Sequence, residues 1–262
     1  MTDIPCPDWG TLLDNSPHAP PTFTVQEVIR MVTTYSKPFQ VKGDDGRIYW
    51  IKVIRSNGEG ASGHAIFLDQ IAGHLGRKLD APIPWVGLGD IPADLSGQGQ
   101  FAHVPPNFCH AVMDIPNAGA RINTLYLSEG NKSRYAALAV LYGLIGDGDR
   151  QFLYDSENKV WAVDFGHSFG GNPNWNATTL QSFNPPPLPG AFIAAAGLNA
   201  TDLKPVIDKL ISLLHNGRGL VDVISVPPDS WGVSREERIT LLQTIWTRSQ
   251  QIISSFNAQN VA

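Results

Sequence analysis

The stretch Val160-Trp161-Ala162-Val163-Asp164-Phe165-Gly166 holds the most informative residues of this chain. Its apolar first half predicts a short β-strand, and the Asp-Phe-Gly triplet places a carboxylate directly after that strand. Asp149 lies fifteen residues upstream in the loop 146–151, and Lys52 lies in a strand pattern over residues 47–54. Phosphoryl transfer from ATP needs a cation for the phosphates, a carboxylate near the nucleophile and a carboxylate for Mg²⁺. These groups occur here in that order, so the sequence predicts a site for phosphoryl transfer.

The strand pattern around Lys52 alternates between two faces. Trp50 and Lys52 fall on one face, while Tyr49 and Ile51 fall on the other. A lysine on an apolar face either extends its ammonium group past the edge to solvent or holds an anion as a point charge. The carboxylates downstream favour the second interpretation.

Composition argues against several classes of function. The formal net charge is −5 and no long Lys/Arg cluster offsets it, so we expect no nucleic-acid-binding face on the chain by itself. The two cysteines make neither a disulfide framework nor a zinc site. No apolar run approaches the roughly 20 residues of a membrane span, and the first residues lack a secretory pattern. We therefore expect a cytoplasmic protein without membrane association.

We predict an α+β fold with two lobes. Residues 1–22 are expected to form an irregular lead-in, residues 23–116 a β-rich N-terminal lobe, and residues 117–262 a mainly helical C-terminal lobe. The two lobes would form one domain, and a cleft between them is a natural ligand site.

Local patterns predict the elements of each lobe. Thr24 and Glu27 fit a capping box, so a helix is expected to begin there. Residues 38–54 fit a β-hairpin with a turn over 43–46, and residues 152–163 fit a second hairpin. Helical periodicity predicts further helices over residues 65–79, 132–145, 202–215 and 235–255.

Residue chemistry suggests a role for each polar group. Lys52 would hold the α- and β-phosphates, and Asp164 would bind Mg²⁺, which prefers one or two carboxylates plus phosphate oxygens. Asp149 would orient the attacking hydroxyl or accept its proton, with Asp147 as the alternative two residues away. Gln151 would offer its amide oxygen to the metal. A structural alternative is that Asp147 and Asp149 only cap the backbone of a tight turn.

Together with other segments, these motifs give the chain a clear family resemblance. It resembles the HipA-like kinases, an atypical branch of the protein-kinase fold related to the phosphoinositide kinases. The segments that carry the resemblance are residues 39–47, 50–52, 69–72, 81–84, 149–151, 163–167, 171–175 and 226–232. The family implies a two-lobed fold that binds Mg-ATP between its lobes. Its best-known members phosphorylate serine or threonine in bacterial toxin–antitoxin systems linked to growth arrest.

The resemblance also implies further site residues. Met113 and Asp114 fall where a hinge strand meets adenine, so their backbone groups are expected to contact the base. The helix carboxylate that pairs with the lysine is expected near position 70, which Gln70 occupies. Asp69 and Glu59 are the alternatives for that pairing.

Two departures from the family concern catalysis. The Asn that usually follows the catalytic Asp by five residues is replaced by Tyr154. No glycine-rich phosphate loop precedes Lys52; the segment 56–63 follows it and is either a flexible phosphate cover or only a connection.

Three functions are compatible with the sequence. The first is an ATP-dependent phosphotransferase that acts on a protein hydroxyl. The second is a catalytically weak or inactive nucleotide-binding module, a pseudokinase that acts by protein interaction. The third is a kinase for a small-molecule hydroxyl or an enzyme that transfers AMP from ATP.

Overall fold

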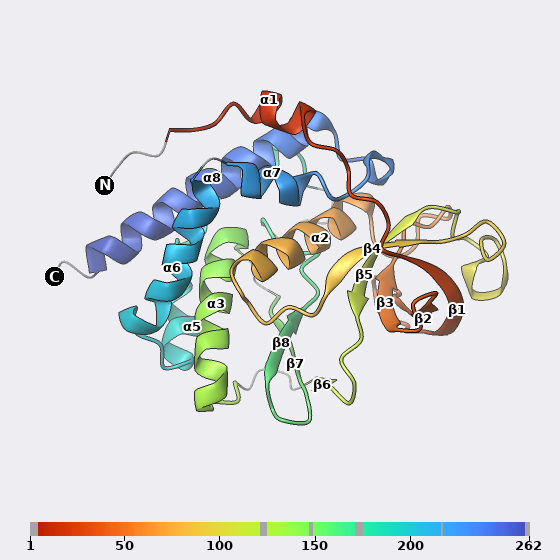
Figure 1. Cartoon of the computed structure of the whole chain (residues 1–262), viewed down its shortest axis with the longest axis horizontal. Coiled ribbons are helices and arrows are strands. Elements are labelled where there is room, and N and C mark those ends of the chain that lie inside the picture. Colours follow the sequence, from red (N-terminus) through yellow and green to blue (C-terminus); the bar gives the residue numbers. More distant parts are fainter. Residues whose placement is uncertain (1–4, 121–124, 147–148, 171–174, 216, 260–262) are drawn as a thin grey trace.

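Five strands in the first part of the chain close into a barrel (Figure 1). The strands are β1 (Phe23–Met31), β2 (Phe39–Gly43), β3 (Ile48–Lys52), β4 (Val86–Asp90) and β5 (Phe108–Met113). Their order around the barrel is β1-β2-β3-β5-β4. β1 and β4 are parallel, and the other neighbouring strands are antiparallel. The computed structural model describes residues 5–120, 125–146, 149–170, 175–215 and 217–259.

The alternation predicted for β3 is confirmed, and it separates the barrel core from the outer face. Tyr49 and Ile51 are buried inside the barrel, together with side chains such as Phe39 and Val41. Trp50 and Lys52 point to the opposite face of the same strand and are only partly buried. The hairpin predicted around β2 and β3 is also confirmed, since the two strands pair from Phe39–Ile51 to Lys42–Ile48.

The helix predicted from Thr24 and Glu27 is wrong, because this segment is the strand β1. Register shifts between Val25 and Glu27, and again between Val28 and Arg30, mark bulges against β2. A bulge adds one residue to a strand and breaks the period of two. The resulting spacing of apolar residues resembled the period of a helix.

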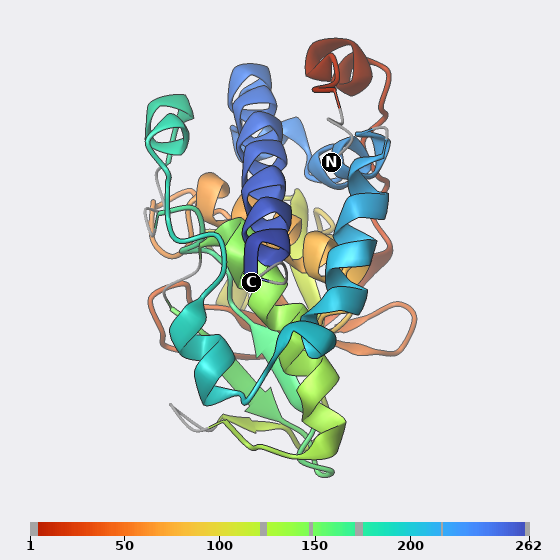
Figure 2. The ribbon, with the colours of Figure 1, turned by 90° about the vertical axis from the view of Figure 1, so that its left-hand side faces the viewer.

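Eight α-helices are the main regular elements of the described chain outside the barrel (Figures 1 and 2). They are α1 (Trp9–Asp14), α2 (Gly63–Lys78), α3 (Glu129–Ile145), α4 (Ala177–Gln181), α5 (Gly190–Ala195), α6 (Ala200–Leu214), α7 (Arg218–Ile224) and α8 (Arg235–Gln259), with 3₁₀ turns η1 (Gly99–Phe101) and η2 (Asp229–Trp231). The four long helices predicted by periodicity are confirmed. α1 corrects the prediction that residues 1–22 are irregular. Within the described ranges, no helix is both long and apolar enough to cross a bilayer.

A small sheet lies beside the helices and carries the Asp-Phe-Gly triplet at its end. Its strands are β6 (Gly119–Ala120), β7 (Gln151–Tyr154) and β8 (Val160–Val163), so the second predicted hairpin is confirmed. Gln151 pairs with Val163 in this hairpin. The first residue of β7 therefore lies next to the end of β8, where Asp164 begins.

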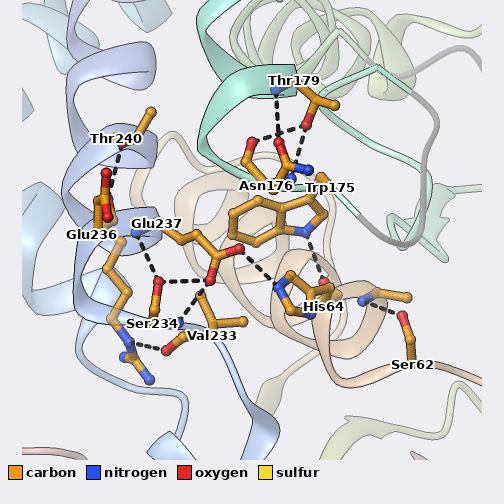
Figure 3. Close-up of polar contacts among 12 residues, drawn as sticks. Ser62, His64, Trp175, Asn176, Thr179, Val233, Ser234, Glu236, Glu237 and Thr240 are labelled. Atoms are coloured by element: carbon orange, nitrogen blue, oxygen red, sulfur yellow. Dashed lines mark hydrogen bonds and ion pairs between the residues drawn. The ribbon is translucent and has the colours of Figure 1, made fainter.

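The helix α2 lies between the barrel and the other helices (Figure 1). Its first turn is tied to the first turn of α8 by side chains (Figure 3). The Glu237 carboxylate accepts hydrogen bonds from the Ser234 backbone N–H and hydroxyl, both at 2.8 Å, and from His64 Nε2 at 3.2 Å. The Trp175 indole donates to the His64 carbonyl at 3.0 Å. The start of α2 is thus attached to the helical part of the molecule.

The close approach of α2 to η2 requires glycine at position 63. A Cβ atom added at Gly63 would overlap the carbonyl oxygen of Trp231. We expect Gly63→Ala to lower the free energy of unfolding by about 2–3 kcal/mol, because backbone must move to make room. Gly130, in the first turn of α3, is a matched control, because a Cβ atom there would make only an ordinary contact with the Ser128 hydroxyl at 4.0 Å. Gly130→Ala is expected to stabilise by about 0.5–1 kcal/mol, and equal urea midpoints for the two variants would contradict this packing.

Candidate active site

A cavity of about 680 Å³ lies between the outer face of the barrel and the β7–β8 hairpin. Its lining includes six of the predicted site residues, namely Lys52, Met113, Asp114, Asp149, Gln151 and Asp164. Gln70 does not line this cavity, and Asp147 lies outside the described residues. The structure thus brings together groups that are more than a hundred residues apart in the sequence.

Lys52 is held between two carboxylates. Its Nζ atom donates to Asp69 Oδ2 at 2.7 Å and to Asp164 Oδ1 at 2.6 Å. Burial alone would lower the pKa of Lys52, but the charges of Asp69 and Asp164 more than offset this effect and raise the pKa above its ordinary value. The side chain is therefore a fixed positive charge at the cavity wall.

The helix residue that pairs with Lys52 is Asp69, and the assignment of Gln70 to this role is wrong. Asp69 also accepts the backbone N–H of Phe165 through Oδ1 at 2.5 Å. A Cβ atom at Gly166 would lie 3.2 Å from Asp69 Oδ2, so glycine allows the Asp-Phe-Gly triplet to approach α2 closely. Glu59, the other alternative, instead binds Lys37 at the surface.

Gln70 belongs to a buried neutral network behind the lysine. Its Oε1 atom accepts from His110 Nδ1 at 2.5 Å, and its amide nitrogen donates to His74 Nε2 at 2.9 Å. His110 pairs with Lys52 across the β3–β5 ladder. Burial, and then the charges of Lys52 and His74, hold the pKa of His110 well below its ordinary value. The imidazole beside the lysine is therefore uncharged.

Asp149 and Asp164 are bridged by one amide group. Gln151 Nε2 lies 3.3 Å from Asp149 Oδ2 and 3.3 Å from Asp164 Oδ2. The Asp164 backbone is left-handed, with φ of 63°, a conformation that aspartate tolerates better than most residues. This turn directs the chain from β8 toward α2 while the carboxylate faces Lys52.

Asp164 and Gln151 are the residues that could hold a magnesium ion in this cavity. The described residues contain no group of three or more His, Cys, Asp or Glu side chains placed to hold a metal ion. Asp164 is 32% exposed, whereas Asp69 is 3% exposed, so Asp164 is the accessible carboxylate of the lysine pair. Mg²⁺ commonly takes one or two carboxylates plus phosphate oxygens and water. The Gln151 amide oxygen can bind a metal here only if the amide group flips, because its nitrogen now faces both carboxylates.

Met113 and Asp114, the predicted hinge residues, line the cavity at the end of β5. Their backbone donors are already used within the barrel. The Met113 N–H donates to the Trp85 carbonyl at 2.8 Å, and the Asp114 N–H donates to the Ile48 carbonyl at 2.9 Å. The predicted backbone contact with a base is therefore restricted to the carbonyl oxygens of these two residues.

The loop between β1 and β2 covers the cavity, and the segment 56–63 does not line it. Thr34, Tyr35 and Ser36 of this loop face the cavity. The segment 56–63 supports the loop from behind, since Glu59 binds Lys37 at 2.6 Å. Of the two roles considered for this segment, the structure favours the connection.

Comparison with known proteins finds structural relatives. No protein-family model and no curated protein sequence matches the chain. The proinflammatory kinase CtkA of Helicobacter pylori matches with a TM-score of 0.57 and 12% identity, over 92% of this chain and 97% of CtkA. The chain has a kinase-like fold. The prediction of this fold from the sequence is confirmed.

Two further solved structures also match. The Golgi casein kinase gives a TM-score of 0.48 and 10% identity, over 97% of this chain and 78% of that one. HipA of Shewanella oneidensis MR-1 was solved with HipB and operator DNA. It gives a TM-score of 0.39 and 10% identity, over 100% of this chain and 70% of HipA.

The Lys52–Asp69 pair can be tested by changing its charge while keeping its shape. Asp69→Asn keeps an oxygen for the Phe165 N–H but leaves buried Lys52 with one carboxylate. We expect it to lower the free energy of unfolding by about 1–3 kcal/mol, measured by urea denaturation. Asp208→Asn, which removes an exposed partner of Lys204, should change stability little. Equal effects of the two variants would contradict a buried pair.

The half-buried His74 predicts a loss of stability in mild acid. Burial, and then the charges of Arg77 and Lys78, lower the pKa of His74 to about 4. An unfolded histidine binds a proton near pH 6.5, so between these values the unfolded state binds more protons. The free energy of unfolding should therefore fall as the pH falls from about 6.5 to about 4, by up to about 3 kcal/mol for this residue. His74→Gln should give a shallower slope in chemical denaturation, and an unchanged slope would contradict the assignment.

Proposed function

We propose that the protein is an ATP-dependent phosphotransferase that binds Mg-ATP in the cavity between a β-rich lobe and a helical lobe. The observation that carries this proposal is the position of Lys52, which holds Asp69 and Asp164 at the same time. Asp149 and Asp164 both accept a hydrogen bond from the side-chain amide of Gln151. A cation for phosphates, a metal carboxylate and a second carboxylate for the nucleophile thus share one cavity.

Each residue has a defined part in the proposed reaction. Lys52 binds the phosphates, and Asp164 with Gln151 would hold Mg²⁺, which offsets the charge of the phosphate oxygens when bound. Asp149 orients the acceptor hydroxyl and takes its proton. The hydroxyl oxygen then forms a bond to the γ-phosphorus as the bond to the β–γ bridging oxygen breaks. ADP and a phosphate ester are the products.

The acceptor that we propose is a hydroxyl group of a protein, with serine or threonine suggested by the family resemblance. A small-molecule hydroxyl and transfer of AMP remain the chemical alternatives. A cytoplasmic location and a bacterial toxin–antitoxin-like role stay predictions from the sequence. We propose that the chain by itself binds neither a membrane nor a nucleic acid.

One observation favours a second candidate, a nucleotide-binding pseudokinase that acts by protein interaction. The amide of Gln151 occupies the space between Asp149 and Asp164. An amide is a weaker ligand for Mg²⁺ than a carboxylate, so turnover would be slow if this amide stayed in place. The protein would then bind a nucleotide without efficient transfer.

The two candidates are separated by a transfer assay with radiolabelled ATP. The purified protein is incubated with Mg²⁺ and ATP labelled at the γ-phosphate, beside Asp149→Asn, Asp164→Asn and the control Asp208→Asn. We expect label on the protein or on an added protein acceptor with the wild type and the control. Loss of at least 10²-fold is expected for the other two variants. All variants should melt within a few degrees of the wild type.

Other outcomes of this assay have clear meanings. ATP-dependent thermal stabilisation without transfer would support the pseudokinase and contradict the enzyme. Label that transfers only from α-labelled ATP would indicate AMP transfer. Absence of both binding and transfer would contradict the proposed site.

A further inference from the structure

Side chains alternate between two directions along the segment that carries Asp149. Asp149, Gln151 and Leu153 line the cavity. Arg150 and Phe152, which lie between them in the sequence, do not line it, and Phe152 packs against the helical core. Successive side chains of an extended chain point to opposite faces. The contacts that hold Arg150 on the core side therefore act on the backbone that presents Asp149 to the cavity.

Arg150 is held by aromatic rings from three elements. Its guanidinium carbon lies 5.0 Å from the centre of the Tyr142 ring on α3 and 5.2 Å from the centre of the Phe192 ring on α5. These two rings meet edge to face with their centres 5.5 Å apart, and the Phe152 ring of β7 stacks on Phe192 at 6.2 Å. We call Tyr142, Phe152 and Phe192 the aromatic clamp. A guanidinium group is attracted to the faces of such rings within about 6 Å.

The charge of Arg150 distinguishes this contact from simple filling of space. Arginine stays protonated in proteins, and burial of a polar group without a partner is costly. Within the described ranges, the Arg150 Nε atom is buried and has no hydrogen-bond partner. An apolar side chain would fill the same space without this cost. The rings of the aromatic clamp are thus the contacts that hold a charged group directly beside Asp149.

The aromatic clamp connects helices outside the cavity to the residue that would accept the proton. Tyr142 lies near the end of α3 and Phe192 lies within α5, and neither ring lines the cavity. A general base must lie within roughly 3 Å of the proton that it takes, and a displacement of about 1 Å can lower a rate about 100-fold. The position of Asp149 therefore needs a firm attachment, and Arg150 supplies one from the side opposite the cavity.

We propose that Arg150 is a positioning residue, which directs Asp149 toward the acceptor hydroxyl through its attachment to the aromatic clamp. This inference rests on the proposed phosphotransferase and adds residues outside the cavity on which its rate depends. Neither Arg150 nor the rings of the clamp line the space for the nucleotide and the acceptor. They act on the step in which Asp149 takes the hydroxyl proton, and not on the binding of Mg-ATP.

The test is a double-mutant cycle on phosphate transfer, in which kcat and the KM for ATP are measured for the full chain. Arg150→Met removes the charge but keeps a flexible apolar side chain against the rings, and Phe192→Leu removes one ring of the clamp. Each variant should lower kcat about 10- to 100-fold and change the KM for ATP less than about twofold. Because both changes remove the same contact, the double variant should lose no more than the weaker single variant.

Arg134→Met is the matched control. Arg134 also lies over an aromatic ring, that of Trp161, at 4.6 Å, and it donates to the Val160 carbonyl, but it does not line the cavity. This variant should melt at a lower temperature than the wild type and keep the wild-type kcat. Melting curves of all variants give the fraction that is folded, to which each kcat is normalised. If Arg150→Met does not fold, Phe192→Leu alone still tests the connection.

The possible results separate the role of Arg150 from the proposed function. An unchanged kcat in folded Arg150→Met or Phe192→Leu, a raised KM in place of a lowered kcat, or losses that add in the double variant would overturn the positioning role while the phosphotransferase stands. Absence of transfer by the wild type would overturn the proposed function and this inference together. A loss of kcat that is shared by the single variants and is not summed in the double variant would support the inference.

Discussion

The carboxylate of Asp69 connects the three parts of the candidate site. One oxygen binds Lys52 on the barrel, and the other accepts the backbone N–H of Phe165 after β8, while Asp69 itself belongs to α2. Burial of a lysine is costly unless the charge is paired and hydrogen-bonded. Lys52 can therefore occupy the cavity wall because Asp69 on α2 and Asp164 after β8 both pair with it. The position of Asp164, next to Phe165, depends on the same contact.

Gln70, beside Asp69, belongs to a hydrogen-bond network with two histidines, which the resemblance to kinases did not indicate. Gln70 accepts from the buried His110 and donates to the half-buried His74, so both are held as neutral imidazoles. A carboxylate at this position would favour a proton on either ring. An additional positive charge next to Lys52 would then change how the lysine is shared between Asp69 and Asp164. The amide keeps the ion pair and the histidine network electrically separate.

The kinase-like fold, and the gathering of Lys52, Asp149 and Asp164 around one cavity, were predictable because they depend on short local patterns. The alternation around Lys52 and the strand before Asp164 are such patterns. The choice between Asp69 and Gln70 was not predictable, because nearly every residue in the middle of α2 is buried. Periodicity then cannot show which side faces the lysine. The strand β1 was missed for a related reason, since its bulges remove the alternation that identifies a strand.

The attachment of α2 has a consequence for the mobility of the Lys52–Asp69 pair. The helix begins against the Trp231 carbonyl, and His64 is bonded to Glu237 at the start of α8. Rotating α2 outward, which would separate Asp69 from Lys52, must also break these contacts with the helical core. The helix is therefore poorly suited to act as a movable switch. The Lys52–Asp69 pair is thereby fixed from two sides, by the barrel strand that carries the lysine and by the helical core that holds α2.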